Sequence, residues 1–328
     1  MLARRFSERI GRARPLSVAA VLIPALALAA GLAAGRGAHA DDAPADRAER
    51  SERCAVRLSI ALTGKSPDAA LMGSADPQSR VDAMLASPEF AERMARFVNA
   101  QLNGGPQADA TDDPVYYLAK HVVSRGEPWA ALFTGPYSVT PTADAMQVTD
   151  DPAGLGYFRT PSWMKRYAGN EDQGYMLVGA FRIIANTTGL ELMASVGNPG
   201  DDRSAEGRKG PECKGCHYDR WYALDTFAKL LPRKRGQGDA ITFSPPTEGP
   251  QQLLGKTIKD DKELVSTLVA SDAFKFHQCR MVFQFLYGRA ENQCEATVFD
   301  ACVDALSSAG TIQSAVAAVA KDPTFCAN

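Results

Sequence analysis

The stretch Cys213-Lys214-Gly215-Cys216-His217 decides how the chain is interpreted, because only here do two cysteines lie three positions apart with a histidine directly after them. This spacing is typical of the attachment site of a c-type haem. The two thiols can add across the two vinyl groups of one porphyrin, while His217 turns its imidazole towards the iron. We therefore expect one covalent haem c, attached through Cys213 and Cys216, with His217 as the proximal iron ligand.

Two other kinds of site also use a Cys-x-x-Cys pair: an exported redox dithiol and one half of a zinc site. A zinc site needs a second pair of ligands. The sequence has no second Cys-x-x-Cys, and the only other histidines after residue 40 are His121 and His277. The flanking residues also lack the pattern of a strand that leads into a helix, which a thioredoxin-like dithiol requires. Haem attachment is therefore favoured over both alternatives.

The N-terminal residues have the pattern of a secretory signal peptide. Residues 2–14 carry five arginines and one acid, and an apolar stretch follows from about residue 16 to residue 34. Ala38-His39-Ala40 then matches a small-x-small cleavage site. We expect a Sec-type signal over residues 1–40, cleaved after Ala40, and a periplasmic or otherwise exported protein; a retained anchor is the alternative. Because covalent haem is attached outside the cytoplasm, export and the haem motif agree.

Cleavage would change the charge and leave no further membrane segment. The signal holds six Arg and one Glu, so its removal takes the formal net charge from −2 to −7, and nothing in this acidic chain indicates nucleic-acid binding. No second apolar run approaches 18 residues, so no transmembrane span is expected after cleavage. The sequence leaves the oligomeric state open. The expected divisions are a signal peptide at 1–40, a disordered linker at 41–53, a helical and loop-rich bridging region at 54–200, and a haem domain at 201–328.

The hydrophobic patterns predict a mainly α fold, in which a helical N-terminal region precedes an all-α haem domain with C-terminal helices. Ser87-Pro88-Glu89-Phe90 is a strong helix start, because Ser caps the helix, Pro suits its first position and Glu suits its dipole. That helix should end near Asn103. Further helices are predicted over 273–287, where Gly288 stops the helix, and over 296–307 and 312–320.

The five cysteines outside the motif predict disulfides in an oxidising compartment, with one cysteine left over. Four of them lie within the last 50 residues. We favour a Cys279–Cys294 bridge, since a helix that ends at Gly288 and a short return could bring these two together. A Cys302–Cys326 bridge is a weaker second expectation.

The sequence resembles the Planctomycete-type cytochrome c families, which are exported bacterial proteins. Their haem motif is followed by Leu-acid-x-Phe, here Leu224-Asp225-Thr226-Phe227, and a later helix ends in aromatic-x-x-Gly-Arg, here from Phe285 to Arg289. The likeness covers roughly residues 205–328 and, more weakly, 54–103. The family's Asp-Pro-x-Gly turn after the haem histidine is missing. The resemblance implies haem binding and electron transfer without naming a reaction.

Other residues are candidates for the haem environment. Trp221, Tyr222 and Phe227 follow the motif and can pack against the porphyrin. The sixth iron position could be open, or it could be filled by one of four residues. These distal candidates are His277, Met281, Met193 and Met176.

A basic surplus surrounds the motif, with nine cations and four acids between residues 203 and 235. These cations could pair with haem propionates or attract an acidic redox partner protein, although such a run is more often a solvated face. The predicted function is an exported monohaem c-type cytochrome that transfers single electrons. The alternatives are a peroxidase-like haem enzyme with an open iron position, and a structural or assembly protein stabilised by haem.

Overall fold

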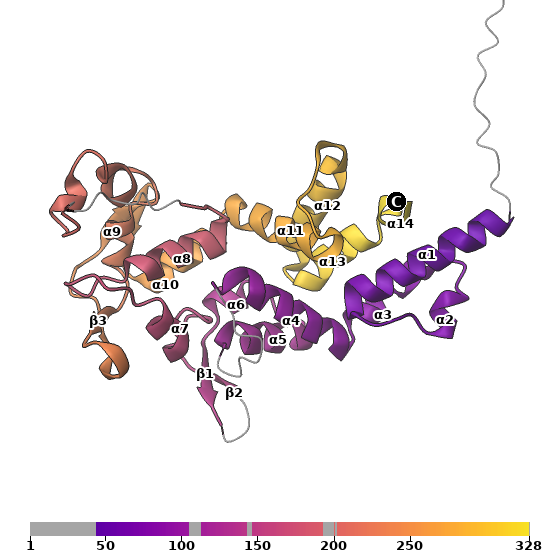
Figure 1. Cartoon of the computed structure of the whole chain (residues 1–328), viewed down its shortest axis with the longest axis horizontal. Helices are drawn as coiled ribbons and strands as arrows, with labels where there is room; N and C mark the ends of the chain where they lie inside the picture. The colour runs from indigo at the N-terminus through magenta and orange to yellow at the C-terminus, as the bar shows by residue number, and fades with distance from the viewer. Residues whose placement is uncertain (1–43, 105–112, 143–145, 193–199, 201, 328) are drawn as a thin grey trace, which may run out of the picture. The chain divides into compact units, whose positions relative to one another are not determined.

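Helices make up most of the fold, which confirms the predicted mainly α class (Figure 1). The computed structural model describes residues 44–104, 113–142, 146–192, 200 and 202–327. Its α-helices are α1 (Pro44–Thr63), α2 (Ala69–Met72), α3 (Val81–Leu85), α4 (Pro88–Leu102), α5 (Pro114–Arg125), α6 (Ala131–Thr134), α7 (Pro161–Arg166), α8 (Leu177–Thr188), α9 (Leu224–Ala228), α10 (Asp261–Val269), α11 (Asp272–Tyr287), α12 (Ala296–Ala309), α13 (Ile312–Ala320) and α14 (Pro323–Ala327).

Short turns and antiparallel hairpins connect the helices. The strands pair two by two in the order β1–β2, β3–β4 and β5–β6. They are β1 (Tyr137–Pro141), β2 (Met146–Asp150), β3 (Arg233–Arg235), β4 (Thr242–Ser244), β5 (Gln251–Leu253) and β6 (Lys256–Ile258). The short helical turns are η1 (Pro77–Arg80), η2 (Gly207–Lys209), η3 (Gly215–Asp219), η4 (Gly238–Ala240) and η5 (Gln293–Glu295).

Helix ends with strong local signals lie close to their predicted positions. The Ser87 hydroxyl accepts from the Phe90 amide at 3.2 Å, Pro88 is the first residue of α4, and α4 ends at Leu102. Gly288 ends α11 with a left-handed φ of 71°, a conformation that a residue without a Cβ adopts at little cost. These signals work because a cap involves only neighbouring residues.

The disulfides differ from the expected ones. Cys279 is bonded to Cys302, and Cys54 to Cys326, while Cys294 is free and exposed. The predicted Cys279–Cys294 and Cys302–Cys326 pairs are therefore wrong. Cys279 and Cys302 are fully buried where α11 packs on α12, whereas Cys294 lies in the η5 turn between these helices and faces solvent.

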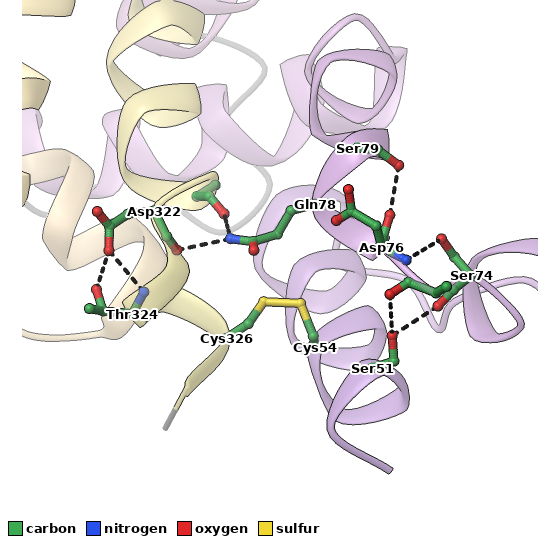
Figure 2. Close-up of a disulfide and its surroundings, with 11 residues drawn as sticks. Ser51, Cys54, Ser74, Asp76, Gln78, Ser79, Asp322, Thr324 and Cys326 are labelled. Atoms are coloured by element: carbon green, nitrogen blue, oxygen red, sulfur yellow. Dashed lines mark hydrogen bonds between the residues drawn. A yellow bond between two sulfur atoms is a disulfide. The ribbon is translucent and has the colours of Figure 1, made fainter. Parts of the chain in front are cut away.

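The Cys54–Cys326 bridge joins α1 to α14, at opposite ends of the described chain (Figure 2). Gln78 reinforces this contact, because its side-chain amide donates to the carbonyl oxygens of Ala320 and Asp322 at 2.8 and 2.9 Å. In Figure 1 the yellow C-terminal helices accordingly lie beside the indigo α1 and α3, with which they are in contact.

Two predicted boundaries need correction. Residues 44–53 of the linker predicted as disordered at 41–53 are helical, because they form the first turns of the long helix α1. The division near residue 200 does not separate two cores, since the described residues form one compact unit in which α8 packs on α9, α10 and α11. Buried Trp129, for example, donates its indole N–H to Gln278 Oε1 at 2.8 Å.

The helices of the fold can be compared with the prediction that no transmembrane span follows the signal peptide. Within the described residues, no helix has both the length and the apolar composition that a membrane span requires. The predicted signal peptide at 1–40 lies outside these residues.

Candidate haem-attachment site

The Cys-x-x-Cys-His motif forms a tight helical turn. The Lys214 amide donates to the Gly210 carbonyl at 2.8 Å and the His217 amide donates to the Cys213 carbonyl at 3.2 Å. The turn then widens into η3, a single turn of π-helix. Both motif cysteines are partly exposed free thiols. The turn thus places two available sulfurs and one imidazole on a single short segment.

The imidazole of His217 is held from one side by a buried carboxylate. Its Nδ1 lies 2.6 Å from Oδ2 of Asp225, which is in the first turn of α9 and only 4% exposed. A histidine that ligates a metal usually engages its second ring nitrogen in this way, so that the other nitrogen is directed to the metal. In His217 the nitrogen left for a ligand is Nε2.

A buried arginine holds Asp225 in turn. Arg208 Nη2 donates to Asp225 Oδ1 at 2.7 Å, and Arg208 Nε lies 3.1 and 3.2 Å from the two carboxylate oxygens. The Tyr218 hydroxyl lies 3.1 Å from Asp225 Oδ1 and 3.0 Å from the Ala205 carbonyl oxygen, so these two acceptors share its single proton. Glu171 extends the network, 3.5 Å from Arg208 Nη2. We call His217, Asp225, Arg208, Tyr218 and Glu171 the proximal network.

These contacts favour the ionised carboxylate. Burial acts to raise the pKa of Asp225, but the hydrogen bonds from His217 and Arg208 outweigh it and lower that pKa below its ordinary value. Burial likewise opposes the charge on Arg208, yet its bonds to Asp225 raise the Arg208 pKa. Burial and the nearby Asp225 charge raise the pKa of Tyr218 to about 12. Tyr218 therefore acts as a neutral donor to a charged pair.

The three residues expected to pack on a porphyrin lie in different environments. Trp221 is 46% exposed beside the motif, and its ring meets that of Tyr222 edge-on, with 5.4 Å between centroids. The Tyr222 hydroxyl lies 3.8 Å from Cys216 Sγ. Phe227 has no exposed surface and packs in the protein core. Trp221 thus offers the most accessible of the three rings.

Two of the distal candidates, His277 and Met281, lie away from the motif. Met281 and His277 both belong to α11. Met281 is buried, and His277 lies against Gly189, which ends α8, since a Cβ on Gly189 would come within 2.5 Å of the His277 Nδ1. The main neighbours of η3 are η2 and α9, whereas α11 packs against α1, α8, α10, α12 and α13. Met193 lies outside the described residues.

Met176 is the remaining distal candidate, and its backbone runs close to the proximal network. It is the N-cap residue of α8, and the preceding amide, that of Tyr175, donates to Glu171 Oε2 at 2.9 Å. Its side chain is 1% exposed. Among the three candidates that the structure describes, Met176 is the one whose neighbours in sequence contact the network.

Most of the basic surplus is bound within the chain. Arg208 belongs to the proximal network, and Arg233 stacks on Tyr175 with its guanidinium carbon 3.9 Å from the ring centroid. Lys209 pairs with Glu206, Lys214 with Asp219, and Arg233 with Glu248. Lys234 donates to the Gly169 carbonyl at 2.7 Å. An acidic redox partner stays a prediction, because these contacts explain many of the cations without one.

Asp225 is the main residue of the candidate site that the motif alone does not reveal. In the sequence it stands out only as the acid of Leu-acid-x-Phe, eight positions after His217. The useful signal is an acid that begins a short helix close behind the motif. Arg208 and Glu171 carry no comparable signal, because their link to Asp225 depends on tertiary contacts.

A zinc site would need several His, Cys, Asp or Glu side chains close together. Across residues 44–104, 113–142, 146–192, 200 and 202–327, no group of three or more His, Cys, Asp and Glu side chains is arranged to hold a metal ion. A haem iron needs fewer protein ligands, because the porphyrin supplies four nitrogens. His121 lies elsewhere, on α5, with its Nε2 3.8 Å from Glu127.

Comparison of the chain with protein-family models, with curated proteins and with solved structures found no match. The resemblance to the Planctomycete-type cytochrome c families stays a prediction, and the function is inferred from the residues of the site.

Proposed function

We propose that this protein is an exported monohaem c-type cytochrome that transfers single electrons. The observation that carries the proposal is the hydrogen bond between His217 Nδ1 and buried Asp225, because it leaves Nε2 as the ring nitrogen that can bind iron. The same turn also holds two free thiols. When bound, the haem supplies a one-electron Fe(III)/Fe(II) couple.

The residues fit a covalently attached haem. Cys213 and Cys216 would form its two thioether bonds, because neither thiol is engaged in a disulfide and both are partly exposed. His217 would be the proximal ligand, and Trp221 would cover part of the porphyrin with its exposed ring. Met176, Met193, His277 and Met281 stay candidates for the sixth position.

Export is the second part of the proposal. Two disulfides support it, because such bonds persist mainly in oxidising compartments. The basic and apolar pattern of residues 1–40 supports it independently.

Haem attachment is tested by producing the full chain in a bacterium with a c-type maturation system. We expect the intact mass to rise by one haem, and a pyridine haemochrome spectrum to show thioether-linked haem. Cys213→Ser and Cys216→Ser should each lose one thioether bond. Cys294→Ser is the matched control, because Cys294 is also free but lies outside the motif.

Wild-type protein without covalent haem would contradict the proposal. Attachment that is unaffected by Cys213→Ser or Cys216→Ser would contradict the assignment of the motif.

A haem enzyme is the second candidate function. The observation that favours it is the buried carboxylate on His217, because a more strongly donating axial ligand supports activation of bound oxidants. The ferric spectrum discriminates between the two functions. Low-spin, six-coordinate iron favours electron transfer, whereas high-spin iron that binds cyanide or peroxide rapidly favours catalysis.

A further inference from the structure

We infer that Asp225 is a positioning residue that increases electron donation from His217 and so lowers the reduction potential of the iron. The inference rests on the proposed function, because it requires haem at Cys213 and Cys216. It adds a property that haem attachment alone does not specify, namely which oxidation state the protein favours.

The hydrogen bond has the geometry that this role requires. At 2.6 Å the Nδ1 to Oδ2 distance is at the short end for a bond between an imidazole and a carboxylate, and Asp225 is almost fully buried. A carboxylate is a stronger acceptor than a neutral carbonyl, and low polarity strengthens the bond further. It draws the Nδ1 proton away from the ring, so Nε2 becomes a stronger donor. A stronger donor stabilises Fe(III) relative to Fe(II).

The surroundings fix the carboxylate in place. Asp225 lies on α9, which is anchored by the fully buried Phe227 and Ala228 two and three residues further on. The Arg208 guanidinium holds both carboxylate oxygens, and Glu171 lies 3.5 Å from Arg208 Nη2. The orientation of Asp225 towards His217 is thus built into the fold.

Tyr218 and Arg208 limit how strongly Asp225 acts on the imidazole. Arg208 donates fully to the carboxylate, and Tyr218 shares its proton between Asp225 and the Ala205 carbonyl, so Tyr218 has the smaller effect. Every such bond withdraws electron density that Asp225 would otherwise offer to His217. Loss of Asp225 should therefore raise the potential, whereas loss of the Tyr218 hydroxyl should lower it. Opposite signs from two neighbouring residues would not follow from a merely structural role.

The test compares Asp225→Asn with Asp219→Asn in haem-loaded full-length protein. Both substitutions remove one negative charge close to His217, but the Asp219 side chain is 52% exposed and its ion pair is with Lys214. The readouts are the reduction potential and, for ferrous protein with five-coordinate iron, the iron–histidine stretching frequency, measured by resonance Raman spectroscopy. We expect Asp225→Asn to change the Fe(III)/Fe(II) equilibrium at least tenfold towards Fe(II), about 59 mV, and to lower the stretching frequency. Asp219→Asn should change both readouts much less.

Haem-loaded Asp225→Asn protein with the potential and stretching frequency of the wild type would overturn the inference and leave the proposed function intact. The inference also fails if Asp219→Asn has as large an effect, because the role of Asp225 would then be only that of a nearby charge. Wild-type protein without covalent haem would remove the proposed function itself.

A second variant covers the case in which Asp225→Asn does not fold or load haem. Tyr218→Phe removes only the phenol hydroxyl and keeps the ring. We expect its potential to fall and its stretching frequency to rise. A rise in potential, or no change in either readout, would overturn the inference.

Discussion

At the scale of single residues, His217 and His277 lie in different electrostatic surroundings. Nδ1 of His217 is hydrogen-bonded to a buried carboxylate, whereas His277 is only partly buried and has Arg280 as a nearby charge. Burial, with a smaller contribution from Arg280, lowers the pKa of His277 to about 4. A protonated His277 is therefore disfavoured in the folded protein.

This shift predicts a loss of stability in mild acid. Because the pKa of His277 is lower in the folded chain than its ordinary value of 6.5, the unfolded chain binds the proton more readily. The contribution is fully present above pH 6.5 and is lost as the pH falls towards 4, to a limit of roughly 3 kcal/mol. Urea unfolding of wild type and His277→Gln between pH 4 and pH 8 checks this. The variant should show the weaker pH dependence, and equal slopes would refute the prediction.

At the scale of elements, two helices end in the same way but in different surroundings. Gly126 ends α5 and Gly189 ends α8, and both have left-handed φ values, 61° and 70°. A Cβ on Gly126 would meet nothing within 4 Å, whereas one on Gly189 would come within 2.5 Å of His277. Substitution of Gly126 by alanine therefore measures the cost of a Cβ to the left-handed backbone alone, and substitution of Gly189 measures that cost together with the cost of a steric clash.

We expect Gly126→Ala to lower the free energy of unfolding by about 1 kcal/mol, the cost of a left-handed residue that has a Cβ. Gly189→Ala should lower it by a further 1–3 kcal/mol or so, because His277 must also move. Urea denaturation of both variants measures the difference. Equal losses in the free energy of unfolding would show that His277 can move away from the new methyl group at no cost.

Sequence rules succeeded for elements wherever the determining contacts are local. Ser87 and Gly288 lie at the ends of α4 and α11 as predicted, because a cap depends on residues within one turn. The disulfide predictions failed because pairing depends on which helix faces meet. Cys279 is closer in sequence to Cys294, yet it bonds with Cys302, which shares its buried interface.

In the candidate site, too, the features set by local sequence are predictable and those set by tertiary contacts are not. The three motif residues are recognisable from spacing alone, and the structure keeps them on one turn. Asp225 is visible in the sequence, but its spacing from the motif does not predict its contact with His217. Its partners Arg208 and Glu171, which lie 17 and 54 residues before it, are linked to it only by the fold.

At the scale of the whole molecule, the Cys54–Cys326 bridge connects residues 272 positions apart. A cross-link that closes so long a loop restricts the unfolded chain strongly, and removal of a native disulfide typically costs about 2–5 kcal/mol. We expect the double variant Cys54→Ser/Cys326→Ser to lose stability in this range in non-reducing urea denaturation. Cys294→Ser is the control and should leave the free energy of unfolding unchanged, since Cys294 is free and exposed. A double variant as stable as the wild type would show that the bridge adds nothing to the contact of Gln78 with the C-terminal segment.

The long separation of Cys54 and Cys326 also has a consequence for the order in which disulfides form and haem is attached. On the proposed export route the chain emerges from its N-terminus, so Cys54 is exposed to oxidants long before Cys326 follows, and the motif thiols Cys213 and Cys216 are the next to appear. Oxidation in order of emergence would join Cys54 to Cys213 and block haem attachment. Under the proposed function, the native pairing is reached if haem captures the motif thiols before Cys54 does, or if a thiol reductant or isomerase undoes an early bridge.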